Sequence, residues 1–293
     1  MKNFLLILAI LISSSVISAQ DIEDYLGSYS DENAYGYLEP LSEVFGANMN
    51  SGWFRDAHVN HMKFQFYIGF VATSGLIKSN QQTFTVNSEY GGTAEVPTIF
   101  GPTESVRINR PNGLAENYPG GFDLGVLPLA VPQASIGGLW GTEVAFRYFA
   151  VDVGEDVGKM DLFGWGIRHS ISQYFSELPV DIALGYYCQS YGLGNYIDAN
   201  MRLISAQVDY TTGILDFYGG LGYEMNTMDI EYIPDEEENV PVIHSYDTNP
   251  FRFTAGINLN LGVFKIHGDY NLSSTSVFSL GMGLGFGTKK VKD

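Results

Sequence analysis

The chain has 293 residues, a formal net charge of −18 and only 16% charged residues. Soluble domains usually carry about 25% charged residues. The acidic balance argues against nucleic acid as a partner, because phosphate binding needs clustered Lys and Arg. The single cysteine, Cys188, cannot form an internal disulfide, which excludes a small secreted domain built on disulfides.

Residues 1–19 have the pattern of a signal peptide. Lys2 precedes an apolar run from Phe4 to Ile12, and small residues then lead to a cleavage point expected after Ala19. This run is too short to cross a bilayer as a helix, and no later stretch approaches the roughly 18 apolar residues needed. We therefore predict a chain exported by a Gram-negative cell, without a helical membrane anchor.

Residues 20–61 are predicted to form an N-terminal plug-like segment. Helical spacing of apolar residues is seen at Tyr37, Leu38, Leu41, Val44 and Phe45. Pro40 suits the first turn of a helix and disfavours its interior, so we expect one short helix that begins near residue 39. A segment ahead of a barrel either fills the lumen or packs beneath it, and we favour the lumen.

Strand patterns dominate the rest of the chain. From residue 142 onward, eight segments of about ten residues alternate apolar with small or polar side chains. This is the length that a tilted strand needs to cross the hydrocarbon of an outer membrane. Residues 62–72 and part of 122–138 predict two more strands, and "QTFTVNSEY" with "AEVPTIF" could add a hairpin. Residues 62–293 are thus predicted to form an all-β, transmembrane antiparallel barrel of 10 to 12 strands.

The two faces of these strands differ sharply. The predicted lipid face includes Phe163, Trp165, Ile167, Phe278, Leu280, Met282, Leu284 and Phe286. The opposite face carries Arg147, Arg168, Asp181, Asp209, Asp216, Arg252, Lys265, His267 and Asp269. A charge on the lipid face near the midplane costs about 2 to 4 kcal/mol, so this face is assigned to the lumen. Arg202 is an exception, at a strand end from which its stem can reach the interface.

The final strand raises a question of its own, because its lumen face carries glycine at Gly281, Gly283, Gly285 and Gly287. Because glycine has no side chain, this face leaves space for side chains that fill the lumen or for a plug. A soluble two-sheet sandwich is the alternative fold, and its outward faces should hold more Lys, Glu and Thr than these do.

The lumen charges mix both signs. Such a balance favours mutual pairing that closes the interior or holds a plug, whereas an ion-selective pore would show one sign in excess. Hydrophobic solutes could still enter a closed barrel sideways, between the strands and the plug.

The turns alternate between short and long along the chain. If both termini are periplasmic, the short turns lie inside and the long acidic segment between residues 226 and 249 lies outside.

No residue pattern indicates an enzyme, a cofactor or a metal site. His58 and His61 lie near Asp56, but no third ligand is evident, and two surface histidines are the simpler interpretation. His169 is expected at a membrane interface. Inward-facing Ser and His residues occur without the fixed spacing of a hydrolase.

Three blocks of the sequence carry a resemblance to known proteins. They are "GYLEPLSEVFGANMNSGWF", "PQASIGGLWGTEVAFRYF" and "DLFGWGIRHSISQYFSELPVDIALGYY". In this order they resemble an uncharacterised family of exported proteins of Bacteroidetes-type bacteria, a domain of unknown function. The resemblance covers nearly the whole chain after the signal peptide. It implies an outer-membrane barrel and brings no activity or substrate.

A looser likeness is to the long-chain fatty-acid transporters of the outer membrane, which also place an N-terminal segment before a barrel. The stretch "NRPNGLA" at 109–115 resembles an Asn-Pro-Ala stretch of those transporters, but it follows the first strand and lacks their spacing.

Two functions remain open from the sequence. The first is porin-like passage of small apolar molecules across the outer membrane. The second is a non-transporting structural or surface-binding barrel, whose acidic outer loop at 229–239 meets a partner or divalent cations. The expected partners are outer-membrane lipid and a small apolar ligand, and the oligomeric state is left open.

Overall fold

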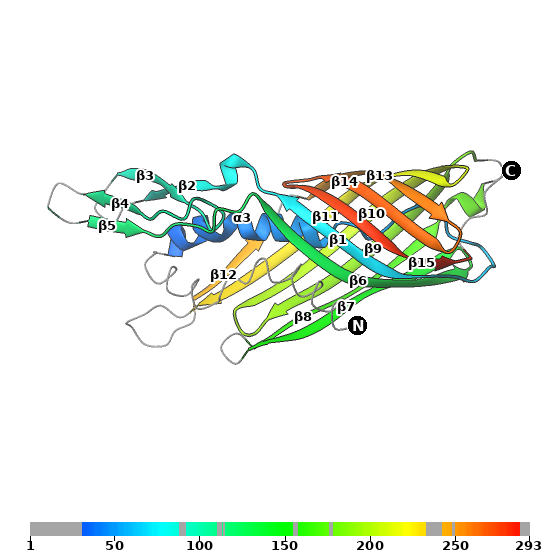
Figure 1. The fold of residues 1–293 in the computed structure, drawn as a ribbon, viewed down its shortest axis with the longest axis horizontal. Coiled ribbons are helices and arrows are strands. Elements are labelled where there is room, and N and C mark those ends of the chain that lie inside the picture. The colour runs from blue at the N-terminus through cyan, green and yellow to red at the C-terminus, as the bar shows by residue number, and fades with distance from the viewer. Residues whose placement is uncertain are drawn as a thin grey trace.

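The structure, a computed structural model, describes residues 31–87, 92–109, 113, 115–154, 158–175, 178–232, 242–247 and 250–287. Within these residues, ten antiparallel strands close into a barrel (Figure 1). The ring consists of β1 (Gln65–Leu76), β6 (Val126–Leu139), β7 (Thr142–Gly154), β8 (Gly158–Ser170), β9 (Asp181–Leu193), β10 (Ile197–Thr212), β11 (Leu215–Tyr232), β13 (Phe251–Leu261), β14 (Phe264–Leu272) and β15 (Ser276–Phe286). β12 (Val242–Asp247) pairs with the far end of β11, outside the ring.

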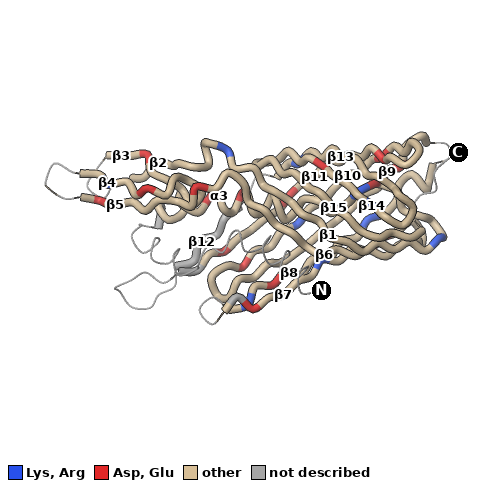
Figure 2. The backbone as a smooth tube through the Cα atoms, in the orientation of Figure 1, with Lys and Arg blue, Asp and Glu red and all other residues tan. Residues whose placement is uncertain are grey.

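The closed ring confirms the predicted fold class and its lower strand count. β1 pairs with β15 on one side and with β6 on the other, while β10 pairs with β11, so the described strands leave no open edge in the ring. A two-sheet sandwich is therefore excluded. Figure 2 shows that charged residues interrupt the barrel strands only at scattered positions.

Alternation along the strands sorts side chains between the two faces of the wall. Each of the eight residues predicted for the lipid face is a large, exposed hydrophobic side chain. The same exposed surface includes Ile204, Phe217, Leu221, Phe253 and Ile257. The inner face is polar and buried. An apolar exterior around a polar interior is the arrangement of a membrane-spanning barrel, in which every strand satisfies its backbone through its neighbours.

The two prolines of β6 lie where β6 pairs with only one neighbouring strand. β6 pairs with β1 from Val126 to Gly137, but its pairing with β7 begins only at Gln133. Pro128 and Pro132 precede that point. Proline is tolerated at such a strand edge because its missing N–H breaks no ladder there.

The predicted extra hairpin is not part of the barrel. Between β1 and β6, β2 (Thr83–Asn87) pairs with β3 (Thr93–Pro97), and β4 (Val106–Asn109) pairs with β5 (Ala115–Tyr118). These strands have four or five residues, whereas a tilted membrane strand needs about nine to eleven. They form an extension beyond one mouth of the barrel (Figure 1).

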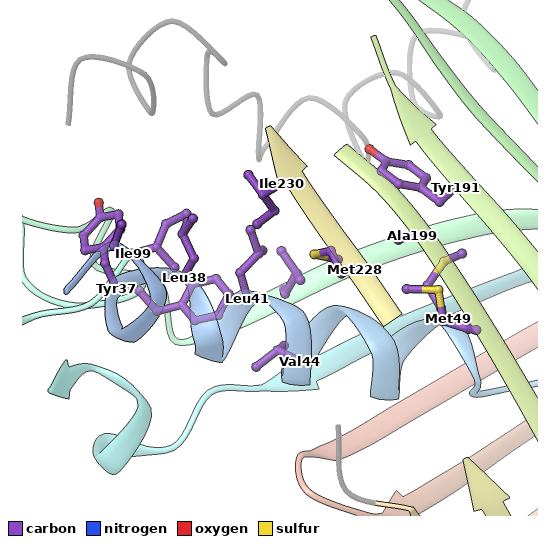
Figure 3. Packing of buried hydrophobic residues seen from close by; sticks show 14 of the residues in the cluster. Tyr37, Leu38, Leu41, Val44, Met49, Ile99, Tyr191, Ala199, Met228 and Ile230 are labelled. Atoms are coloured by element: carbon purple, nitrogen blue, oxygen red, sulfur yellow. The ribbon is translucent and has the colours of Figure 1, made fainter. Parts of the chain in front are cut away.

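The prediction of a short N-terminal helix was wrong. Helix α3 runs from Asp31 to Met49 with Pro40 inside it. An interior proline costs about 3 kcal/mol in helix stability, but here the flanking apolar residues Tyr37, Leu38 and Leu41 are buried. Figure 3 shows them packed with Ile99 and with residues at the ends of β9, β10 and β11. Burial against these distant segments outweighs the local cost of proline.

Gly36 allows close packing on the same helix, since a Cβ there would lie 2.4 Å from the ring of Phe84 in β2. Within the described residues, no helix combines the length and the hydrophobicity needed to cross a membrane.

The glycines of β15 make room for aromatic rings inside the barrel. A Cβ on Gly281 would lie 2.1 Å from the imidazole of His267, and a Cβ on Gly283 would lie 2.8 Å from the ring of Tyr67. These two rings make an edge contact, with centroids 6.4 Å apart. The bare face of the last strand is thus filled by side chains from β1 and β14.

We predict that Gly281→Ala lowers the free energy of unfolding by about 1 to 3 kcal/mol, because the new methyl group overpacks the site of His267. Gly268→Ala is the matched control, since the nearest atom to its Cβ would be 3.5 Å away. Denaturant unfolding of the barrel in lipid vesicles measures both. Equal stability of the two variants would contradict this account of the glycines.

Candidate functional site

The chain leaves α3 at Met49 and passes through the barrel lumen. Residues 50–57 are all buried, and they form hydrogen bonds with inner-face side chains of several strands. Asn50 donates to Asn226 of β11 (2.8 Å), Gln133 of β6 donates to the Trp53 carbonyl (3.1 Å), and the Ala57 N–H donates to Asp209 of β10 (3.2 Å). We call residues 50–57 the lumen segment.

Two buried arginines of the wall meet the end of α3. Arg147 of β7 donates to the carbonyls of Met49 (2.9 Å) and Ser51 (2.8 Å). Arg252 of β13 donates to the carbonyl of Ala47 (2.5 Å), and Gln189 of β9 also donates to Met49. The last carbonyls of a helix have no partner within it and form the negative end of the helix dipole. Since α3 has no basic residue in its last turn, the barrel wall supplies the cations.

Each of these arginines is held by further contacts. The Arg147 Nε donates to Gln133 (2.8 Å), and its guanidinium lies 3.9 Å from the centroid of the Trp53 ring. Arg252 donates to Glu224 Oε1 (2.5 Å) and to Ser51 Oγ (2.7 Å). A planar guanidinium has five donors on three nitrogens in a rigid fork and can serve widely spaced acceptors at once, whereas the three donors of a lysine all lie on one nitrogen.

A second charged layer surrounds the later part of the lumen segment. Arg168 of β8 forms ion pairs with Glu143 of β7 (2.8 Å) and Asp56 (3.0 Å), and it also donates to the Asp56 carbonyl. Arg55 lies 4.1 Å from the centroid of the Tyr67 ring. The lumen segment is therefore fixed to the wall by charge at both of its ends.

The other predicted lumen charges face inward with different partners. Lys265 donates to Asn260 (2.8 Å), and Asp269 accepts from Tyr218 (2.9 Å). Further pairs join Asp216 to Thr211, Asn258 and Asn260, and Asp181 to His58 at 3.2 Å. The ring nitrogens of His267 have no hydrogen-bond partner among the described residues.

The acidic partners of the arginines were not among the residues predicted from the sequence. Glu143 and Glu224 lie on the inner face in phase with Arg147 and Asp216, so their parity along the strands could have identified them. Arg55 and Asp56 belong to an irregular segment without periodicity, and the sequence pattern marked Asp56 only as a neighbour of His58 and His61, not as a partner of Arg168.

The predicted histidines lie near the short turns. His58 contacts Asp181, and His61 contacts Gln173 (2.6 Å). His169 lies within hydrogen-bond distance of Thr142 (2.9 Å) and Tyr174 (2.8 Å). No group of three His, Cys, Asp or Glu residues suited to a metal ion occurs in the described part of the chain.

The barrel wall has a hollow of about 600 Å³ over β11, β13, β14 and β15. Its lining residues are Phe217, Tyr218, Ala255, Gly256, Ile257, Gly268, Asp269, Tyr270 and Phe278. Phe217, Ile257 and Phe278 belong to the exposed outer face, whereas Tyr218 and Asp269 belong to the buried inner face. We call this feature the wall hollow. Small residues at Ala255, Gly256 and Gly268 leave the wall thin at this point.

A closed ten-stranded barrel with an apolar outer face and a filled polar lumen defines an outer-membrane β-barrel protein. The chain belongs to the family described as "Family of unknown function (DUF6588)", whose model matches residues 1–286. No curated protein sequence matches it.

Several solved barrel structures are similar to this one at low identity. Ail, the attachment invasion locus protein of Yersinia pestis, is 13% identical over 77% of this chain and 100% of that chain, with a TM-score of 0.26. The trimeric OmpT of Vibrio cholerae is 10% identical over 78% of this chain and 100% of that chain (TM-score 0.29). The toluene transporter TbuX of Ralstonia pickettii is 9% identical over 82% of this chain and 92% of that chain (TM-score 0.25). TM-scores this low carry no inference about activity.

We predict that Arg147→Lys releases the lumen segment from the wall. Lysine keeps the charge but cannot reach both carbonyls and Gln133 together, and each lost hydrogen bond to a charged group costs about 1.5 to 3 kcal/mol. Trypsin should then cleave after Arg55, which is buried in the wild type. Mass spectrometry of the fragments measures the cleavage.

Arg107→Lys is the control, because Arg107 is exposed on β4 outside the barrel. A gel shift between unboiled and boiled samples shows that each variant retains its barrel. If folded Arg147→Lys resists trypsin as well as the wild type, the role given to this arginine is incorrect.

Proposed function

We propose that this barrel allows small apolar molecules to pass across the outer membrane, and that they exchange with the membrane hydrocarbon at the wall hollow. The wall hollow is the observation that carries the proposal. Its volume falls within the range of small-molecule sites, about 300 to 1,000 Å³, and its lining is mostly apolar, although it is open to the membrane along one side.

The wall hollow opens on the side that faces lipid. Phe217, Ile257 and Phe278 are exposed around it, so an apolar molecule dissolved in the membrane can reach it without crossing water. On the lumen side of the wall behind the wall hollow, the Tyr218 hydroxyl donates to Asp269 (2.9 Å). A solute with one polar group that enters between the strands could exchange hydrogen bonds with this pair.

The floor of the wall hollow also contacts the lumen segment. The Phe54 ring makes an edge contact with the Tyr218 ring, at a centroid distance of 5.9 Å. Gly220 leaves space for this ring, since a Cβ there would lie 2.8 Å from Phe54. The paired backbones of β11, β13 and β14, together with these two aromatic side chains, thus separate the wall hollow from the interior. In this proposal, local opening of that pairing and displacement of the two rings connect the two compartments.

A non-transporting structural or surface-binding barrel is the second candidate. The buried hydrogen bonds and ion pairs of Arg147, Arg168 and Arg252 favour it, because they hold the lumen segment in place. The acidic loop assigned to surface binding lies mostly outside the described residues, which include only 229–232 of it.

We predict that the purified protein in lipid vesicles speeds the transfer of an apolar fluorescent molecule carrying one hydroxyl group, relative to vesicles without protein. Gly268→Leu should reduce this transfer severalfold, because the new side chain fills the wall hollow from the lipid side. Fluorescence quenching by an acceptor inside the vesicles measures the rate, and lipid extraction identifies any amphiphile that co-purifies with the protein.

Ala206→Leu is the matched control, because it adds a similar side chain to the exposed face of β10, away from the wall hollow. Transfer at the rate of protein-free vesicles, with no co-purified amphiphile, would support the structural barrel instead. A rate that falls equally in both variants would rule out the wall hollow as the route.

A further inference from the structure

We propose that Arg202 and the pocket beside it bind the phosphate headgroup of a membrane lipid, with the acyl chains lying along the apolar face of β10 and β11. The proposal concerns the outer surface of the wall and is independent of transport through the barrel.

On the outer face, Arg202 lies between a polar row and an apolar row of cross-strand neighbours. Its cross-strand neighbours are Cys188 of β9 and Met225 of β11. On the outer face, the next row toward the short turns consists of Tyr186, Ile204 and Tyr223. The next row toward the extension consists of Ser190, Asn200 and Thr227. Aromatic residues in barrels gather at the membrane interface. The guanidinium therefore lies at the depth of lipid headgroups.

Among the described residues, the charge of Arg202 has no ion-pair partner. Lys159 and Arg202 are the two basic residues on the outer face of the ring strands, and Lys159 forms an ion pair with Asp161 (3.4 Å). No acidic side chain among the described residues forms an ion pair with Arg202, which is exposed. An unmatched cation beside a hydrophobic belt is complementary to an anionic headgroup.

A pocket of about 320 Å³ lies next to this cation. Arg202, Asn200 and Thr227 contribute polar groups to it, and Tyr223 and Met225 contribute apolar surface. The pocket forms where the ladder along β11 changes partner: pairing with β13 ends at Tyr223, and pairing with β12 begins at Thr227. The interruption leaves space in the wall that a continuous strand would fill.

The remaining lining residues are compatible with an anion at the mouth of the pocket. Glu224 carries a negative charge, but its Oε1 accepts from Arg252 at 2.5 Å, so a buried cation balances it. Asn226 lines the deeper part beside Pro250. The Asn200 amide donates to Asp198 Oδ1 (2.8 Å), so a phosphate accepts from the guanidinium of Arg202 and the hydroxyl of Thr227, and charge-assisted hydrogen bonds of this kind are the stronger ones.

The surface below the pocket explains why a lipid fits better than free phosphate. Ile204, Leu221 and Phe253 are exposed on the outer face and offer contact to acyl chains. A single exposed cation in water gives little affinity for a small anion, because solvent and salt screen it. Combined contact with the headgroup and chains makes the site selective for a phosphorylated lipid.

Native mass spectrometry of the full chain in detergent micelles tests the proposal, with phosphatidic acid as probe and diacylglycerol of the same chain length for comparison. We expect the wild type to retain phosphatidic acid in preference to diacylglycerol. Arg202→Gln should weaken phosphatidic acid binding about tenfold, or about 1.4 kcal/mol, and should leave diacylglycerol binding unchanged. Lys159→Gln should behave as the wild type.

Three results would overturn the proposal. If folded Arg202→Gln retained as much phosphatidic acid as the wild type, Arg202 would not be part of the binding site. If Lys159→Gln lost as much phosphatidic acid binding as Arg202→Gln, the effect would come from net charge and not from this site. Displacement of phosphatidic acid by inorganic phosphate would show an anion site that does not recognise lipid chains. The gel shift of unboiled samples confirms that each variant is folded.

Discussion

The contact between two wall arginines and the last carbonyls of α3 is the interaction on which the organisation of the interior depends. A membrane barrel turns its polar side chains inward, where a buried charge without a partner is costly. Arg147 meets that requirement through the carbonyls of Met49 and Ser51, and Arg252 through Glu224 and the carbonyl of Ala47. The helix in turn gains cations at its negative end. Each component thus satisfies groups that the other would leave buried and unpaired.

Helix α3 joins the lumen to the extension outside the barrel. Its apolar residues pack with Val86, Val96 and Ile99 of the extension and with Met201 and Met228 at the strand ends, while its last turn binds the wall arginines. A displacement of the lumen segment would therefore disturb this packing as well. Passage through the axis of the barrel requires such a displacement, whereas the proposed exchange at the wall hollow requires local opening of the pairing between strands and movement of Tyr218 and Phe54.

Alternation in the sequence was sufficient to predict the barrel and its strand positions from residue 142 onward, because the period of two is a local property of each strand. The length of α3 was not predictable in this way. Pro40 disfavours a continuous helix, and burial against Ile99 and Phe84, far along the chain, reverses that preference. The ion pairs were also beyond sequence reasoning, since a partner such as Glu224 for Arg252 depends on how strands curve around the ring. Parity along the strands could have placed Glu143 and Glu224 on the inner face, but only the fold gives them partners.

Hydrogen–deuterium exchange of the lumen segment tests this account most directly. With the protein folded in detergent micelles, the amides of residues 50–57 should be protected to a degree comparable with the strands β7 and β13. Exchange at the rate of a free peptide, while those strands stay protected, would show that the arginines do not hold the segment inside the barrel.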